Sequence, residues 1–224
     1  FPPGDTRSLV YRSDVGGNER YQLWRLDLGT GRTTRLTDGK SRHGGYRWSP
    51  DGKQLVFTSN ARNGRDMDLY ISDGRDPRSV KRLLERKGHW YVADWSRDGK
   101  RLLLGHYRSI NDSRLHVLEL ATKKACRITP TTPLASHRLA PIDHSGTRVY
   151  VATDRQDEFT TLYELDLSKN TWTPLTRKIP WNVERLALSP DGKTLVFSVN
   201  EGGWSVLYTL DTKTRGYRRI AGLP

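Results

Sequence analysis

One six-residue phrase recurs along the chain at an almost constant spacing. It reads WSPDGK at 48–53, WSRDGK at 95–100, IDHSGT at 142–147 and LSPDGK at 188–193. Its glycines, Gly52, Gly99, Gly146 and Gly192, are 47, 47 and 46 residues apart. A constant period of this length indicates one supersecondary unit that is repeated several times. The repeat therefore constrains the fold more than any single residue does.

Each repeat also contains short apolar runs that are typical of strands. The clearest reads LWRLDL at 23–28, LYISDG at 69–74, LHVLEL at 115–120, LYELDL at 162–167 and LYTLDT at 207–212. Apolar and polar residues partly alternate in it, which is the period of a half-buried strand. Further runs precede the phrase, follow it and close the unit. Four strands in about 46 residues are typical of one blade of a β-propeller.

We therefore predict an all-β chain that forms a β-propeller of about five four-stranded blades. One domain should span residues 1–224, with repeats at approximately 1–39, 40–86, 87–131, 132–178 and 179–224. The first repeat lacks an innermost strand, which leaves nineteen strands where five complete blades need twenty. We expect a fragment of a larger ring, cut from a longer or processed chain, and its open sheet edges would favour self-association.

The repeated phrase itself is expected to be structural. In Ser-Pro-Asp-Gly, proline presets φ at one corner of a turn and glycine accepts a positive φ at another. The aspartate can accept hydrogen bonds from the backbone of the same turn. A worn copy, Pro3-Gly4-Asp5-Thr6, precedes the first apolar run in the same way.

The sequences of the loops and adjoining strands resemble those of a known family over almost the whole chain. The segments SDVGGNERYQLWRLDL (13–28), FTSNARNGRDMDLYISD (57–73) and ALSPDGKTLVFSVNEGGWSVLYTLD (187–211) carry this resemblance. They resemble the N-terminal, TolB-like propeller of bacterial prolyl oligopeptidase-family serine peptidases, of the acylaminoacyl-peptidase and dipeptidyl-aminopeptidase types. That resemblance implies a propeller that covers the active site of an α/β-hydrolase domain and admits only small or unfolded peptides.

The resemblance transfers no catalytic residue to this chain. The sequence has no G-x-S-x-G nucleophile motif and no Glu-Glu pair of the kind that binds a substrate amino terminus in the dipeptidyl-peptidase branch. We therefore expect a non-catalytic propeller that gates access to a hydrolase domain of the same polypeptide. The alternative is a TolB-like scaffold that binds a protein partner without an attached enzyme. A third reading is an enzyme with a metal on the propeller axis.

Three histidines, His43, His89 and His137, stand at the expected starts of innermost strands, where they could form a partial ring of imidazoles or simply a solvated rim. His43 lies five residues before Trp48 and His89 six before Trp95, so a period of two places them on opposite faces unless a bulge intervenes. There is no H-E-x-x-H and no Cys-x-x-Cys motif. We predict no metal and no cofactor.

We expect peptide or partner binding at the mouth of the channel, near these strand starts. The candidate residues are His43, Arg47, His89, Trp90, Tyr91, Asp94, His137, Arg138, Trp181 and Glu184. For the aromatic members, packing between neighbouring blades is an equally good interpretation. Arginines along the expected lining would favour acidic or carboxyl-terminal peptide groups. The tryptophans at repeat positions are expected in the core: Trp24, Trp48, Trp95 and Trp172.

The charge and composition of the chain limit the classes of partner that we expect. The formal charge is +13, but the basic residues are scattered, so we expect a solvated basic surface and no nucleic-acid partner. No long apolar run is present, so no membrane span is expected. The single cysteine, Cys126, is expected to be a small buried residue. It cannot form an intrachain disulfide, which leaves the bacterial cytoplasm and the periplasm both open.

Overall fold

The structure, a computed structural model, describes residues 1–138 and 141–222. Nineteen strands form five antiparallel sheets, and the described residues contain one short 3-10 helix, η1 (Pro77–Ser79). The first sheet consists of β1 (Ser8–Ser13), β2 (Gln22–Asp27) and β3 (Thr33–Arg35). The second consists of β4 (His43–Trp48), β5 (Leu55–Ser59), β6 (Asp68–Ser72) and β7 (Lys81–Leu84). The third consists of β8 (His89–Trp95), β9 (Arg101–Ser109), β10 (Asp112–Glu119) and β11 (Lys124–Arg127).

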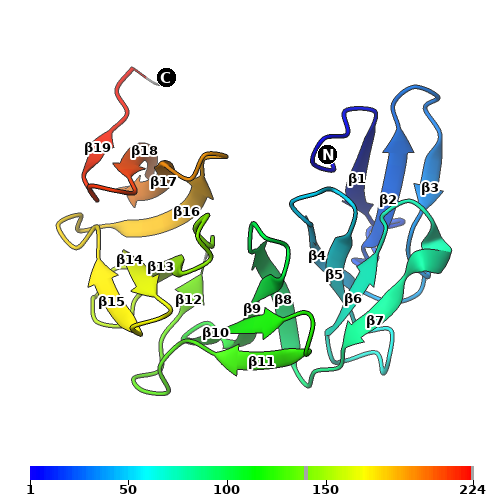
Figure 1. Cartoon of the computed structure of the whole chain (residues 1–224), viewed down its shortest axis with the longest axis horizontal. Helices are drawn as coiled ribbons and strands as arrows, with labels where there is room; N and C mark the ends of the chain where they lie inside the picture. The colour runs from blue at the N-terminus through cyan, green and yellow to red at the C-terminus, as the bar shows by residue number, and fades with distance from the viewer. Residues whose placement is uncertain (139–140, 223–224) are drawn as a thin grey trace.

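The last two sheets repeat the same order. The fourth consists of β12 (His137–Arg138), β13 (Arg148–Thr153), β14 (Thr161–Asp166) and β15 (Thr171–Pro174). The fifth consists of β16 (Asn182–Leu188), β17 (Thr194–Glu201), β18 (Trp204–Asp211) and β19 (Tyr217–Arg219). The five sheets follow one another around an arc, with the first and the fifth at its two ends (Figure 1). The predicted all-β propeller fragment is confirmed, including the strand missing from the first blade.

The core is divided among the contacts between successive sheets. Four apolar clusters occur, one for each pair of neighbouring sheets. In the second blade, every residue of β5 is buried. Such a strand packs against a neighbouring sheet on both faces, so it reads as a continuous apolar run rather than an alternating one. Each blade is therefore stabilised mainly by the next blade along the chain.

The repeated phrase folds as the turn that its composition predicts. The Ser49 hydroxyl donates to Asp51 (2.6 Å) and accepts from the backbone N–H of Gln54 (2.9 Å). Gly52 adopts a φ of 68° and its N–H donates to the Ser49 carbonyl. The same serine–aspartate bond recurs in the third and fifth blades. The phrase has a structural role.

Two expectations about buried residues need correction. Cys126 is exposed, because it lies on the outermost strand β11, where alternation turns its neighbours Ala125 and Arg127 inward instead. Of the four repeat-position tryptophans, Trp95 is buried, Trp48 and Trp172 are half-buried and pack against the core, and Trp24 is half-buried. No helix in the described part of the chain is long and apolar enough to cross a membrane.

Candidate functional site

A cavity of about 340 Å³ lies where the innermost strands converge. Its lining comes from four blades: Arg47, Tyr91, Val92, Ala93, Asp94, Pro141, Leu186 and Leu188. Three of the predicted site residues thus line the same cavity: Arg47, Tyr91 and Asp94. The propeller axis is the place where side chains from several blades can meet. We call this space the axial cavity.

Arg47 spans the gap between the second and third blades. Its Nε donates to the carbonyl of Ala93 (3.1 Å) and its Nη1 to the carbonyl of Tyr46 (2.9 Å). A guanidinium has five N–H donors, so these two bonds fix its plane and leave others for an anionic group in the cavity. The side chain is exposed, and it gives the cavity a cationic wall.

Asp94 joins the third blade to the fourth. One carboxylate oxygen accepts from the backbone N–H of Ile142 (2.9 Å) and the other from that of Trp95 (2.9 Å). Burial raises the pKa of Asp94, while these hydrogen bonds and Arg47 act in the opposite direction. Among the described residues, no group of three His, Cys, Asp or Glu side chains could hold a metal ion. The hydrogen bond from Ile142 lets Asp94 link the third blade to the fourth.

Tyr91 owes its position to a glycine. It lies opposite Gly105 in the β8–β9 ladder, and its ring covers the space that a Cβ would occupy there. A β-carbon on Gly105 would be 1.9 Å from Cζ of the Tyr91 ring. Burial raises the pKa of Tyr91, and the Arg138 charge opposes that rise. Gly105 thus sets where the phenol enters the cavity.

The three histidines at strand starts do not form a ring. His43 and His137 are buried, and the Nδ1 atoms of their rings lie 3.2 Å from the Tyr21 carbonyl and 2.7 Å from the Ser113 carbonyl, respectively. His89 is exposed and packs edge-on against Tyr107. Both β4 and β8 contain one extra residue at a bulge, so the difference of one in spacing persists and the two rings face opposite ways. Trp90, not His89, takes the buried position of His43 and His137.

Trp90 is therefore a packing residue. It is 6% exposed, stacks on His106 with 4.4 Å between ring centroids, and lies 4.8 Å from the His116 ring. Its indole N–H donates to the Lys87 carbonyl (2.9 Å). Trp90 also belongs to the apolar cluster that contains Val56 and Leu69 of the second blade, so it packs between neighbouring blades.

His116 makes the stability of this contact depend on pH. Burial, with help from the positive charges of His106, Arg127 and Arg86, lowers its pKa to about 4. Its Nδ1 is buried without a partner among the described residues. An unfolded chain binds this proton near its ordinary pKa of about 6.5, so stability is lost as pH falls from about 6.5 to 4.

We expect the variant His116→Phe, which keeps the aromatic packing, to lose less stability over that range. Because the ring is partly solvated, the difference between wild type and variant should shift by about 1–2 kcal/mol from pH 7 to pH 4. Urea unfolding at a series of pH values measures it. Parallel pH profiles for the two proteins would contradict this assignment.

The remaining candidates lie near the strand starts. Trp181 is 40% exposed and packs beside Phe159 (6.3 Å between centroids). Glu184 accepts from the Asn200 side chain (3.0 Å), and Arg138 donates to the Ser136 hydroxyl (2.7 Å). Both Glu184 and Arg138 are exposed. Trp204, 79% exposed, begins β18 beside the same strand ends.

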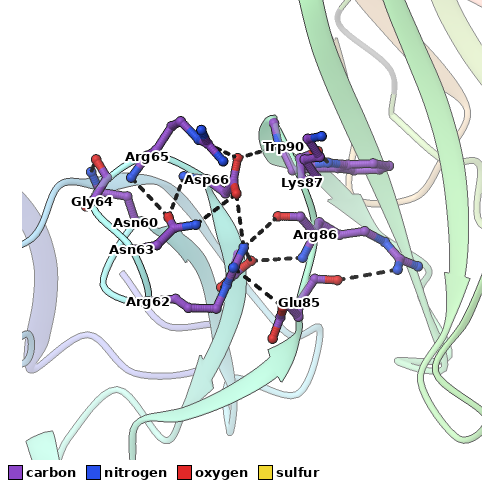
Figure 2. A network of polar contacts seen from close by, with 12 residues as sticks. Asn60, Arg62, Asn63, Gly64, Arg65, Asp66, Glu85, Arg86, Lys87 and Trp90 are labelled. Atoms are coloured by element: carbon purple, nitrogen blue, oxygen red, sulfur yellow. Dashed lines mark hydrogen bonds and ion pairs between the residues drawn. The ribbon is translucent and has the colours of Figure 1, made fainter.

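A polar network on the β5–β6 loop also escaped sequence analysis. Arg62 bonds the buried carboxylate of Asp68 (2.6 Å), that of Asp66 (3.3 Å) and Glu85 (3.5 Å). Asp66 accepts from the backbone N–H of Gly88 (2.9 Å), which holds its pKa well below the usual range. Figure 2 shows how these side chains tie the loop at 60–66 to the segment at 85–88. No spacing in the sequence distinguishes this set from an ordinary charged loop.

Residues 2–180 match the family model described as prolyl oligopeptidase, N-terminal beta-propeller domain. The chain belongs to this propeller family. The family predicted from the loop sequences and the repeat is thus confirmed. The propeller domain is also 31% identical to the "Uncharacterized peptidase YuxL" of Bacillus subtilis (strain 168) over 123 residues. That match covers 50% of this chain and 18% of the relative.

Solved structures share the fold of the propeller domain. The puromycin-hydrolyzing peptidase of Mycobacterium tuberculosis has a TM-score of 0.72 at 17% identity, over 98% of this chain and 39% of that protein. TolB from Acinetobacter baumannii has a TM-score of 0.69 at 20% identity, over 94% of this chain and 50% of that one. At these identities the likeness concerns the fold alone. The chain spans less than a fifth of the length of the Bacillus relative and about two fifths of the mycobacterial structure.

Proposed function

We propose that this chain is the non-catalytic gate of a serine peptidase of the prolyl oligopeptidase type. In this role it packs on an α/β-hydrolase domain of the same polypeptide and limits which peptides reach the active site. Membership of the propeller family is the observation that carries the proposal. The relatives named as peptidases are longer than this chain, which leaves room for a catalytic domain in the full-length protein.

The axial cavity supports selection by size. Its volume of about 340 Å³ suits a few side chains and is far too small for a folded domain. Its lining combines the aliphatic side chains of Leu186 and Leu188 with the cationic and aromatic side chains of Arg47 and Tyr91. An extended peptide with an acidic or carboxyl-terminal group would find both apolar contact and a cation there.

The exposed aromatic residues support contact with the hydrolase domain. Trp181 and Trp204 come from neighbouring strand ends of the fifth blade, since Asn182 pairs with Asn200 and Glu201 with Trp204. Large exposed aromatic side chains are unusual on a free surface and frequent in interfaces. The alternative of a TolB-like scaffold would give the same surface to a separate protein partner.

Narrowing the axial cavity should change the choice of substrate. In the full-length gene product, we expect Ala93→Trp to lower the hydrolysis of peptides of about ten residues by tenfold or more, because about 1.4 kcal/mol of steric cost has this effect. Hydrolysis of a short chromogenic substrate that needs no passage through the cavity should fall less than twofold. Kinetics of both substrates in one preparation measure the ratio.

The matched control is Ala121→Trp, which adds the same side chain to the exposed turn between β10 and β11. It should leave the ratio of the two rates unchanged. An unchanged ratio in Ala93→Trp would contradict passage through the axial cavity. A full-length product without any hydrolase activity would instead favour the scaffold.

A further inference from the structure

A second groove lies on the outer side of the propeller, between the third and fourth blades. Its volume is about 460 Å³, and it is lined by Cys126, Arg127, Ile128, Thr129, Pro130, Arg155, Leu165, Leu167, Asn170 and Trp172. These residues come from the outermost strand β11 and the segment after it, from the start of the β13–β14 loop, and from β14, β15 and their connecting turn. None of them lines the axial cavity. We call this space the outer groove.

Two guanidinium groups in the outer groove lack a carboxylate. Arg127 and Arg155 are half-buried, and neither forms an ion pair with an acid of residues 1–138 or 141–222. Asp112, on the adjoining strand β10, pairs with Arg108 (3.1 Å) and Arg114 (3.1 Å) instead. Removing a cation from water without a counterion is unfavourable. An anion bound in the groove would therefore be stabilised by the two guanidinium groups.

The groups around Arg127 and Arg155 leave part of their positive charge and some of their N–H donors uncompensated. Burial and the charges of Arg114 and Arg108 lower the pKa of Arg127, and the carboxylate of Asp112 offsets them only in part. Among residues 1–138 and 141–222, the donors of Arg127 reach only a Thr129 hydroxyl (3.4 Å) and the carbonyl of Pro130. The Nε of Arg155 and the indole nitrogen of Trp172 are both buried without an acceptor in the described structure. The side chains of the groove thus carry more positive charge and more free donors than the protein neutralises.

The outer groove also contains apolar side chains. Ile128, Leu165 and Leu167 are apolar, and the Trp172 ring lies 5.3 Å from the Arg155 guanidinium carbon. A ligand that fits both parts must combine an anionic group with an apolar one. A carboxylate matches the planar donor fork of arginine, which binds it through two parallel hydrogen bonds.

We propose that the outer groove binds a carboxylate joined to an apolar side chain, the chemistry of the carboxyl-terminal residue of a peptide. The corresponding groove between the first and second blades provides a contrast within the same molecule. The Thr37 hydroxyl accepts a hydrogen bond from the backbone N–H of Leu23, as the Thr129 hydroxyl does from that of Leu115, so the two threonines are equivalent. The residue after Thr37 in that groove is Asp38, in the place of Pro130. That acidic groove would repel a carboxylate. The proposal does not depend on the gating function.

Cys126 provides a direct readout because it is exposed at the edge of the outer groove. The experiment follows alkylation of Cys126 by iodoacetamide in the full-length gene product, by mass spectrometry of the peptide that contains it. N-acetyl-leucine supplies a free carboxylate and an apolar side chain, N-acetyl-leucinamide lacks the carboxylate, and acetate lacks the side chain. We expect N-acetyl-leucine at saturation to slow alkylation at least about threefold and the other two to have little effect.

Variants make the assignment specific. Arg127→Gln should weaken protection by N-acetyl-leucine about tenfold, since it removes a charge-assisted hydrogen bond. It also relieves repulsion from Arg114, so the fold should be retained. Arg32→Gln removes the same charge from the exposed β2–β3 turn. In this variant, N-acetyl-leucine should protect Cys126 from alkylation as well as it does in the wild type. Equal protection by N-acetyl-leucinamide, no protection by any of the three, or full protection in Arg127→Gln would each overturn the proposal.

Discussion

Replacing Asp68 by alanine should lower the free energy of unfolding by about 3–4 kcal/mol, because it leaves buried charges and donors without their partner. Asp68 is fully buried and accepts from Arg62 Nε (2.6 Å), Arg62 Nη2 (3.2 Å) and the backbone N–H of Arg86 (2.8 Å). Its loss would release the β5–β6 loop from the segment at 85–88. Urea denaturation with a fluorescence readout measures the change.

The matched control for this variant is Glu85→Ala. Glu85 bonds the same arginine (3.5 Å), but its side chain is 56% exposed. Exposed ion pairs contribute at most about 1 kcal/mol, so this substitution should have a small effect. Equal losses in the two variants would show that the buried carboxylate is not the centre of the network.

The second large effect concerns the glycine beneath Tyr91. We expect Gly105→Ala to cost about 2–3 kcal/mol, since the added methyl would overlap the ring and force it off its position. The displaced ring would move relative to the axial cavity that it lines. Thermal or urea unfolding measures the cost, and the length dependence of substrate hydrolysis in the full-length product measures the functional consequence.

A double-mutant cycle separates this overlap from other effects of the methyl group. In a Tyr91→Ala background, Gly105→Ala should cost much less than in the wild type, so the two changes should be strongly non-additive. Gly45→Ala, on an innermost strand with open space around its Cβ, should be nearly neutral. Additive effects at positions 91 and 105 would contradict the steric account.

The architecture could be predicted from the sequence because the blades of a propeller appear there as repeats of nearly constant length. Each blade repeats the same turn and the same apolar runs, so Gly52, Gly99 and Gly192 mark turns by their spacing, and all three adopt a positive φ. The degraded first copy, with Gly4 at a φ of 77°, follows the same rule. The missing innermost strand of the first blade could be read in the same way.

The candidate site was harder to predict because it depends on departures from the period. β4 and β8 each contain one bulge, so Trp90, five residues before Trp95, takes the position of His43, five residues before Trp48, but the spacing could not show that this position is buried. The exposure of Cys126 follows from its place on an outermost strand, where an apolar residue need not be buried. The Arg62 network joins two segments about twenty residues apart, and its partners have no characteristic spacing.

The central claim is that this propeller restricts access to a peptidase active site. The most direct test offers the full-length gene product two substrates with the same cleavable sequence, one a short free peptide and the other a loop of a stably folded protein. We expect cleavage of the free peptide and at least about a hundredfold slower cleavage of the folded protein, a difference of about 2.7 kcal/mol in the barrier. Equal rates on both substrates would contradict gating by the propeller.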